Sequence, residues 1–470
     1  MLTLVLFSAT TTDPDLWGHV RFGQDMIAAG RVTLPDSYSF TSDRPWVNHE
    51  WLSEVTMAAA YEKGGPVGLS VLRFGLLLSV LGIVWTSLVG LPDRHKILVV
   101  VAGATGMLWR TLPIRPQLFS LLFFAILLKV IDVADRRKSI RPLLALPVLT
   151  AVWVNTHGGW IVGLGVLAIW VGLTAATSSW PRRVALIGIL VACIAATLAN
   201  PYGYGMWHFL LGTVGFDRPL IADWQPLHEL PPAFWIPWVV SLGLVLSSLG
   251  RAREHGKSLV IAMFLGVISL RVSRLDAFFA IAAMFLVARA RGHSAAESVL
   301  PMTPVRRSPA LTWIFSAMAA VSLLLVAERL RTVPIEPVTV PDAEVGRYVR
   351  THHLKGNLLV WFGWGQYVIW QFGPDLKVSM DGRRETVYSQ GMIDAHMRFY
   401  FEPSGGPQFA DKLRPDYIWL PASLPVIDQL LRVGWRSMCR GPNSVLLTRQ
   451  NATPPCEIGS PSTGRRFPDL

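Results

Sequence analysis

Long apolar segments alternate with short polar ones through the first 330 residues of the chain. A helix needs about 20 apolar residues to cross a bilayer, and several runs here are shorter, which predicts tilted or broken helices. The pattern predicts ten helical segments, at roughly 67–91, 96–112, 117–134, 142–157, 159–177, 184–199, 235–250, 258–271, 275–288 and 309–327. The opening run 2–9 is too short for a span, so we expect the chain to begin inside a first helix.

Basic residues occupy every second polar loop between these segments. The basic loops are 93–96, 135–138, 181–183, 251–257 and 289–307. Because short cytoplasmic loops carry an excess of Lys and Arg, these loops are predicted to lie inside. The alternate loops, 12–64, 155–159, 200–234 and everything after about residue 328, then lie outside. The pattern indicates a multi-pass protein of the plasma membrane.

Composition supports this class. Hydrophobic residues make up 51% of the chain, charged residues only 16%, and there are 19 tryptophans, as is typical of polytopic membrane proteins. The net charge of +12 sits largely in the short loops, so it sets topology and indicates no nucleic-acid partner. The three cysteines form no metal-binding pattern, and Cys439 could pair with Cys456 if that end is outside.

After Pro334 the pattern changes to alternating helical and strand-like stretches. These stretches are 342–353, 357–361, 378–380, 417–420, 423–433 and 444–447. They predict a compact α/β domain. The predicted fold class is therefore mainly α: a polytopic helical membrane domain over 1–330, with its first outer loop at 12–64. An extracytoplasmic α/β domain follows over 331–470, with a disordered tail from about 451.

The first outer loop concentrates acids, histidines and tryptophans at helical spacing. Asp13 and Pro14 suit the start of a helix that would run from Asp15 to about Ala29 and stop at Gly30. Asp15 and His19 are four residues apart and share a face. The alternative is purely structural: Asp13 caps the helix, and Asp15 is a favourable charge in its first turn.

A second helix is predicted to start at Asn48 as the cap and to run to Tyr61. It places Glu50 and Glu54 one turn apart. Both helices are expected to lie on the membrane and to turn carboxylates and a histidine towards one place. The structural alternative is that the two glutamates face water.

Polar and cationic residues recur at the outer ends of the apolar segments. They are Arg110, Arg115, Asn155, His157, Arg271 and Arg274. Guanidinium groups suit phosphate, so a phosphate-bearing substrate is expected where these cations meet the acids of the first outer loop. The alternatives are that the arginines reach to lipid headgroups and that His157 is a hydrogen-bonded core residue.

Eight sequence motifs carry a family resemblance that covers nearly the whole chain. They are DPDLWGH, NHEWLSE, RPQLFS, NTHGG, NPYG, ADWQP, WGQYVIW and MDGR. With them the chain resembles the C-type (GT-C) glycosyltransferases, polytopic enzymes that use polyprenyl-phosphate sugars, and in particular a widespread bacterial family of that superfamily. Gln366 departs from the pattern, which usually has a second glycine there, so that segment implies no function.

The resemblance implies an essential acid just after the first span, the place that Asp13-Pro14-Asp15 occupies. It implies transfer of a hexose or pentose from a polyprenyl-phosphate donor to a glycan or protein acceptor, at the outer face of a bacterial inner membrane. An acceptor hydroxyl needs a base, and we assign Asp13 or Asp15, with Asp15 preferred because it shares a face with His19. Glu50 is the next candidate.

The predicted substrate-binding residues are His19, His49, Arg110, Arg115, Asn155, His157, Arg271 and Arg274. Asp13 and Asp15 also offer the hard oxygen ligands that Mg²⁺ or Mn²⁺ prefers, and a metal there is left open because some enzymes of the class work without one. Two other functions are weighed. A transporter or flippase of a lipid-linked or anionic solute would show inverted repeats, and no convincing repeat is evident. A non-catalytic subunit of an envelope polysaccharide assembly would use the outer domain for docking.

Overall fold

The computed structural model describes residues 2–213, 218, 221–251, 255–292, 309–402, 405–450, 456 and 464–470. The chain forms two compact units. The first, here called the helical unit, comprises Met1–Thr10, Leu69–Tyr204 and Asp217–Arg331. The second, here called the mixed unit, comprises Thr11–Gly68, Gly205–Phe216 and Thr332–Leu470. The first outer loop therefore belongs to the same unit as the carboxy-terminal residues. The predicted domain boundary at residue 330 had placed it with the helical domain instead.

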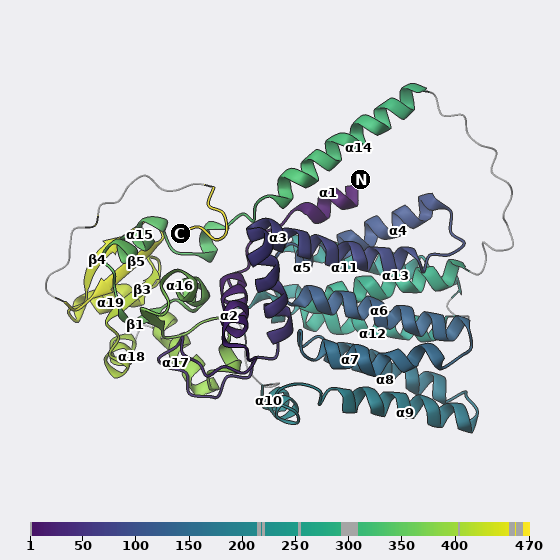
Figure 1. Ribbon diagram of the computed structural model, residues 1–470, viewed down its shortest axis with the longest axis horizontal. Helices are drawn as coiled ribbons and strands as arrows, with labels where there is room; N and C mark the ends of the chain where they lie inside the picture. Colours follow the sequence, from purple (N-terminus) through teal and green to yellow (C-terminus); the bar gives the residue numbers. More distant parts are fainter. Residues whose placement is uncertain are drawn as a thin grey trace. The chain divides into compact units, whose positions relative to one another are not determined.

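Helices make up nearly all regular structure in the helical unit (Figure 1). They are α1 (Leu2–Ser8), the end of α3 (Trp51–Trp85), α4 (Asp93–Gly106), α5 (Leu108–Thr111), α6 (Gln117–Arg136), α7 (Leu146–Trp153), α8 (Trp160–Ala175), α9 (Trp180–Ala196), α11 (Trp235–Leu246), α12 (Gly256–Arg271), α13 (Asp276–Gly292) and α14 (Pro309–Leu330). Short 3₁₀ turns are η1 (Arg141–Ala145), η2 (Ala222–Trp224), η3 (Leu227–Glu229), η4 (Pro232–Phe234), η5 (Leu249–Arg251) and η6 (Ser273–Leu275). Each predicted apolar segment overlaps at least one of these helices, but segment 96–112 covers both α4 and α5 and segment 142–157 covers η1 and α7.

Helix α13 is the core of the helical unit. Every residue from Ala277 to Ala288 is buried, because the helix is apolar all round and packs against α4, α6, α11 and α12. The helices α6, α12 and α13 lie side by side in Figure 1. By length and apolar composition, α3 and α6 could each cross a membrane, and shorter apolar helices occupy Arg141–Trp153, Trp160–Ala175 and Pro232–Leu246. Ten crossings therefore stay a prediction.

The mixed unit is built on a five-stranded sheet in the order β2-β1-β3-β5-β4. Its elements are α2 (Leu16–Ala29), the start of α3, α10 (Gly205–Thr213), η7 (Pro337–Thr339), α15 (Ala343–Thr351), β1 (Gly356–Val360), η8 (Phe362–Trp364), α16 (Gly365–Phe372), β2 (Leu376–Val378), η9 (Arg384–Thr386), α17 (Gln390–Phe401), α18 (Gly406–Leu413), β3 (Tyr417–Pro421), α19 (Val426–Arg432), β4 (Arg436–Arg440) and β5 (Ser444–Thr448). Strand β1 pairs in parallel with β2 and β3, and β5 pairs antiparallel with β3 and β4. The predicted α/β character of this part is therefore present.

A segment of the first outer loop extends the sheet along β2. Ser39 forms a parallel bridge with Val378. The Phe40 amide donates to the Val378 carbonyl at 3.1 Å, and the Val378 amide donates to the Tyr38 carbonyl at 3.0 Å. The edge of β2 is thus paired by a residue more than 300 positions earlier in the chain.

The carboxy-terminal end of the chain also packs on the mixed unit. Cys439 on β4 forms a disulfide with Cys456, with the Cα atoms 5.1 Å apart, which is the pairing the sequence left open. Arg466 forms an isolated antiparallel β-bridge with Pro334, and Phe467 is buried. Residues 464–470 therefore differ from the predicted disordered tail, whereas 451–455 and 457–463 lie outside the described residues.

Helix α2 agrees closely with the sequence prediction, and α3 does not. Helix α2 ends where Gly30 adopts a left-handed conformation (φ 63°) and its amide donates to the Ile27 carbonyl. Helix α3 begins at Trp51, since the side chain of Asn48 instead accepts a hydrogen bond from the Glu50 amide at 3.1 Å. It continues past Tyr61 and breaks at Gly65, where φ is 58° and Pro66 follows.

Candidate functional site

Helix α2 packs on two sides, against α3 and against α16. One face carries His19 and Gly23 towards α3. A Cβ added at Gly23 would lie 2.2 Å from the Glu54 carbonyl oxygen, so only glycine allows the two helices to approach this closely. The adjoining face carries Gly18, with Asp15 one turn before it at the start of the helix, towards α16 and the residues after β2.

His19 and Glu54 form the centre of a buried polar cluster. His19 Nδ1 lies 3.0 Å from Glu54 Oε1, and Asn48 Nδ2 donates to Glu54 Oε2 at 2.6 Å. Potential metal-ligating atoms of His19, Glu50 and Glu54 all lie within 4.8 Å of one another. His49 Nε2 is 3.6 Å from Glu50 Oε1. A histidine of α2 thus meets two carboxylates at the start of α3.

The pKa of His19 reflects this surrounding. Burial disfavours the charged imidazolium, but the hydrogen bond to Glu54 and the charges of Glu50, Glu54 and Asp15 outweigh it. The pKa of His19 is raised from 6.5 to about 9. His19 is therefore a cation at neutral pH, and it partly neutralises the acids around it.

We predict that His19→Gln lowers thermal stability most at acidic and neutral pH. A folded-state pKa above the unfolded value stabilises the protein fully below pH 6.5, and this contribution disappears as the pH rises to about 9. The difference in Tm between the original protein and the variant should shrink across that window. The loss should be on the order of a few kcal/mol at its largest. Thermal unfolding in detergent from pH 6 to 9.5 measures it.

The exposed His228, whose side chain is 70% accessible, supplies the control for that experiment. His228→Gln should leave Tm unchanged at every pH, because surface substitutions away from special features change stability little. A Tm difference for His19→Gln that stays constant from pH 6 to 9.5 would contradict the assigned charge of His19.

Asp13 and Asp15 lie just before α2. Asp13 is buried, and its Oδ1 accepts a hydrogen bond from the Asp15 amide at 2.9 Å. Asp15 is half-buried, and its carboxylate lies against Gly382. Among the described residues, the group of three or more His, Cys, Asp or Glu side chains with ligand atoms close together is His19, Glu50 and Glu54. A cation held by Asp13 and Asp15 stays a prediction.

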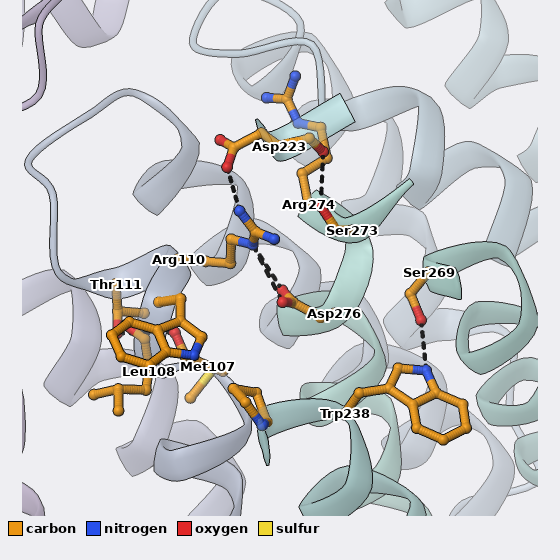
Figure 2. A network of polar contacts seen from close by, with 12 residues as sticks. Met107, Leu108, Arg110, Thr111, Asp223, Trp238, Ser269, Ser273, Arg274 and Asp276 are labelled. Atoms are coloured by element: carbon orange, nitrogen blue, oxygen red, sulfur yellow. Dashed lines mark hydrogen bonds and ion pairs between the residues drawn. The ribbon is translucent and has the colours of Figure 1, made fainter. Parts of the chain in front are cut away.

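In the helical unit, Arg110 is the buried centre of a second cluster (Figure 2). Its Nε donates to both carboxylate oxygens of Asp276, at 3.1 and 3.2 Å. Its Nη1 donates to Asp223, and Arg115 Nη1 donates to the other oxygen of Asp223. Burial opposes the charge of Asp223, yet Arg115, Arg110 and Arg274 lower its pKa from 3.8 to about 2.

The loop that carries Asp223 is fastened to η6. Ser273 Oγ donates to the Ala222 carbonyl at 3.0 Å, and the Ser273 amide donates to the Gln225 carbonyl at 3.2 Å. Figure 2 shows Asp223, Ser273 and Arg274 close together above Arg110 and Asp276. The guanidinium carbon of Arg274 lies 4.7 Å from the ring centroid of Trp224.

His157 extends this cluster. Its Nε2 is 3.1 Å from Arg274 Nη2, and its Nδ1 is 2.8 Å from Ser120 Oγ. Trp153 Nε1 donates to the same Ser120 oxygen at 2.7 Å. Arg110, Arg115, Arg274 and His157 are therefore brought together from segments far apart in the sequence.

Two predicted binding residues have other surroundings. Asn155 Nδ2 donates to the Ala151 carbonyl at 2.7 Å and to the Ala199 carbonyl at 2.8 Å, so it ties the turn after α7 to the end of α9. Arg271 ends α12, and its side chain is exposed.

The acids of the first outer loop belong to the mixed unit, whereas the arginines belong to the helical unit. That these acids and arginines meet in one pocket stays a prediction. Sequence reasoning missed Asp223, which lies in the ADWQP motif, and Asp276, which starts an apolar run. It also drew nothing from Asp381 and Arg383 of MDGR, although both are buried.

The described helices and the small sheet form a GT-C-like fold. The chain is similar to the crystal structure of ArnT from Cupriavidus metallidurans bound to undecaprenyl phosphate, with 11% identity, a TM-score of 0.53, and coverage of 97% of this chain and 98% of that one. It is also similar to the apo structure of the same protein, with 13% identity, a TM-score of 0.51 and coverage of 96% of each chain. The predicted GT-C-like fold is thus confirmed.

No family model matches the chain. No curated protein matches it either.

Proposed function

We propose that this chain is a membrane glycosyltransferase that moves a sugar from a polyprenyl-phosphate donor to an acceptor at the outer face of a bacterial inner membrane. The observation that carries the proposal is the likeness along nearly the whole chain to a solved structure that holds undecaprenyl phosphate. The proposed lipid partner follows from that likeness, and the sugar and the acceptor are left to experiment.

An exposed apolar stripe supports the membrane location. On α9, Val184, Ile187, Val191 and Ile194 are each about half exposed, at spacings of three and four residues. These positions share one face of the helix, and an uncovered apolar face of this length suits contact with lipid.

The disulfide supports the orientation. Disulfides form and persist in oxidising compartments such as the bacterial periplasm and are rare in the cytosol. The Cys439–Cys456 bond therefore suits an extracytoplasmic mixed unit. Loop charges independently place the chain after residue 328 outside, so the two arguments agree.

The proposed reaction needs one base and one site for the leaving phosphate. An acceptor oxygen bonds to the anomeric carbon of the sugar while the bond from that carbon to the phosphate oxygen breaks. The acceptor proton passes to a carboxylate, for which we propose Asp15, with Asp13 and Glu50 as the next candidates. A divalent cation, if bound by Asp13 and Asp15 or by Glu50 and Glu54, would supply charge stabilisation.

The departing lipid phosphate carries away negative charge, which guanidinium groups stabilise. Arg110, Arg115 and Arg274 carry three positive charges, and Asp223 and Asp276 compensate two of them. Among the described residues of this cluster, the positive charges therefore outnumber the negative ones by one. Arg110 is enclosed between both aspartates, so we propose Arg115 and Arg274 as the groups that meet the phosphate.

The test uses the full-length protein in lipid vesicles with a panel of undecaprenyl-phosphate-linked hexoses and pentoses. A bacterial envelope extract supplies acceptors. The expected result is protein-dependent release of undecaprenyl phosphate together with labelled sugar in a non-lipid product. No release above protein-free vesicles would contradict the proposal. Movement of an intact donor across the bilayer without release would instead favour a flippase.

A further inference from the structure

The turn Met380–Arg383, which follows β2 in the mixed unit, is held in shape by a buried ion pair. The Asp381 carboxylate accepts hydrogen bonds from the Arg383 amide at 2.9 Å, from its Nε at 2.9 Å and from its Nη2 at 2.7 Å. Tyr388 donates to the same carboxylate at 3.1 Å. Both partners are buried, so these charge-assisted bonds fix the turn.

Arg383 fastens this turn to the first outer loop. Its Nη1 donates to Asp36 Oδ1 at 2.8 Å. Its guanidinium carbon lies 4.9 Å from the ring centroid of Trp46, 5.1 Å from that of Phe22 and 5.2 Å from that of Tyr38. A cation enclosed by three rings is held by cation–π attraction as well as by its ion pairs. Phe22 belongs to α2, so the turn is anchored directly to that helix.

Gly382 brings the backbone of the turn against the candidate base. A Cβ added at Gly382 would lie 1.7 Å from Asp15 Oδ1 and 2.5 Å from Asp15 Cγ, so only glycine allows this contact. On the same face of α2, a Cβ at Gly18 would lie 1.9 Å from Gln366 Oε1. Asp15, Gly18 and Phe22 are spaced by three and four residues, and together they form the face that docks on the turn and on α16.

We propose that the turn Met380–Arg383 positions the Asp15 carboxylate for proton transfer, so that the carboxy-terminal part of the chain is a component of the active site. The inference rests on the proposed function and goes beyond it, since it makes Gly382 and Arg383 positioning residues. A displacement of a reacting group by about 1 Å can cost about 100-fold in rate, so a side chain at position 382 should impair the reaction.

The first test compares Gly382→Ala with Gly391→Ala in the full-length protein. At Gly391, on α17, the nearest heavy atom to an added Cβ is Ser389 Oγ at 3.9 Å, so that variant is a matched control. We expect Gly382→Ala to lower kcat about 100-fold and to leave KM for the polyprenyl-phosphate donor within about twofold. If the turn had only a structural role, Gly382→Ala would lower the amount of folded protein and leave the kcat of the folded fraction unchanged. Equal kcat in the two variants would overturn the inference.

The second test measures the contact without any substrate. A double variant with Asp15→Cys and Gly382→Cys should form an intramolecular disulfide under mild oxidation, detected as a linked peptide by mass spectrometry. The pair Asp15→Cys and Gly391→Cys should not. Absence of the first link would overturn the inference. If the original protein shows no transferase activity but the disulfide forms in the double variant, the proposed function is wrong and the contact between Asp15 and Gly382 is still supported.

Discussion

Replacing Asp15 by asparagine should lower sugar transfer by at least about 100-fold. Asparagine keeps the size of the side chain and cannot accept the acceptor proton, and a positioned general base typically contributes about 10²–10⁴ in rate. Donor binding should persist, because the lipid phosphate is proposed to bind arginines of the helical unit. The measurement is kcat and KM for undecaprenyl phosphate release in the vesicle assay.

Two comparisons make that result specific. Glu62→Gln removes an exposed acid from α3 and should leave kcat unchanged. Asp13→Asn distinguishes the two candidate bases. Asp13 already accepts a hydrogen bond from the Asp15 amide, so this substitution should disturb the start of α2 as well as the reaction. If Asp13→Asn and Asp15→Asn both retain full transfer, the assignment of the base to this segment is wrong.

Replacing Arg110 by alanine should destabilise the helical unit by about 3–5 kcal/mol. Removing one partner of a buried ion pair leaves the other charge uncompensated away from water, which is among the most costly single changes in a protein. The side chains of Arg110 and Asp276 are only 3% and 2% accessible, so Asp276 would be left in that state. Thermal unfolding in detergent should show a lower Tm and a lower yield of folded protein.

Arg271→Ala is the matched control, because Arg271 is an exposed arginine that ends the neighbouring helix α12. Its effect on stability should lie within about 0.5 kcal/mol. A double variant with Arg110→Ala and Asp276→Ala should recover part of the loss, since it removes the isolated carboxylate. Equal Tm values for Arg110→Ala and Arg271→Ala would show that the buried pair does not stabilise the fold.

Patterns with a local physical cause were predicted well from the sequence. The apolar runs coincide with helices because each contains enough consecutive helix-compatible residues between polar loops. Helix α2 was predicted to within one residue at its start, and Gly30 ends it through its left-handed backbone. Both helices were expected to turn carboxylates and a histidine towards one place, and His19 does lie beside Glu54.

Features that depend on tertiary partners were not predicted. Strand β4 (Arg436–Arg440) lacks an alternating apolar pattern, and it pairs because β5 lies beside it. Asn48 has the residue type of a helix cap but bonds the Glu50 amide ahead of α3. Asp223 and Asp276 gained their importance only when folding enclosed Arg110 between them. The sequence showed the guanidiniums and gave no indication of which acids would neutralise them.

The bridge between Ser39 and Val378 has a practical consequence for dissection of the protein. A fragment that starts at Thr332 would lose this neighbour, and the unpaired edge of β2 would be open to self-association. Such a fragment should therefore aggregate when it is expressed alone. Joining residues 11–68 to residues 332–470 through a flexible linker should restore the pairing and yield a soluble, monomeric piece.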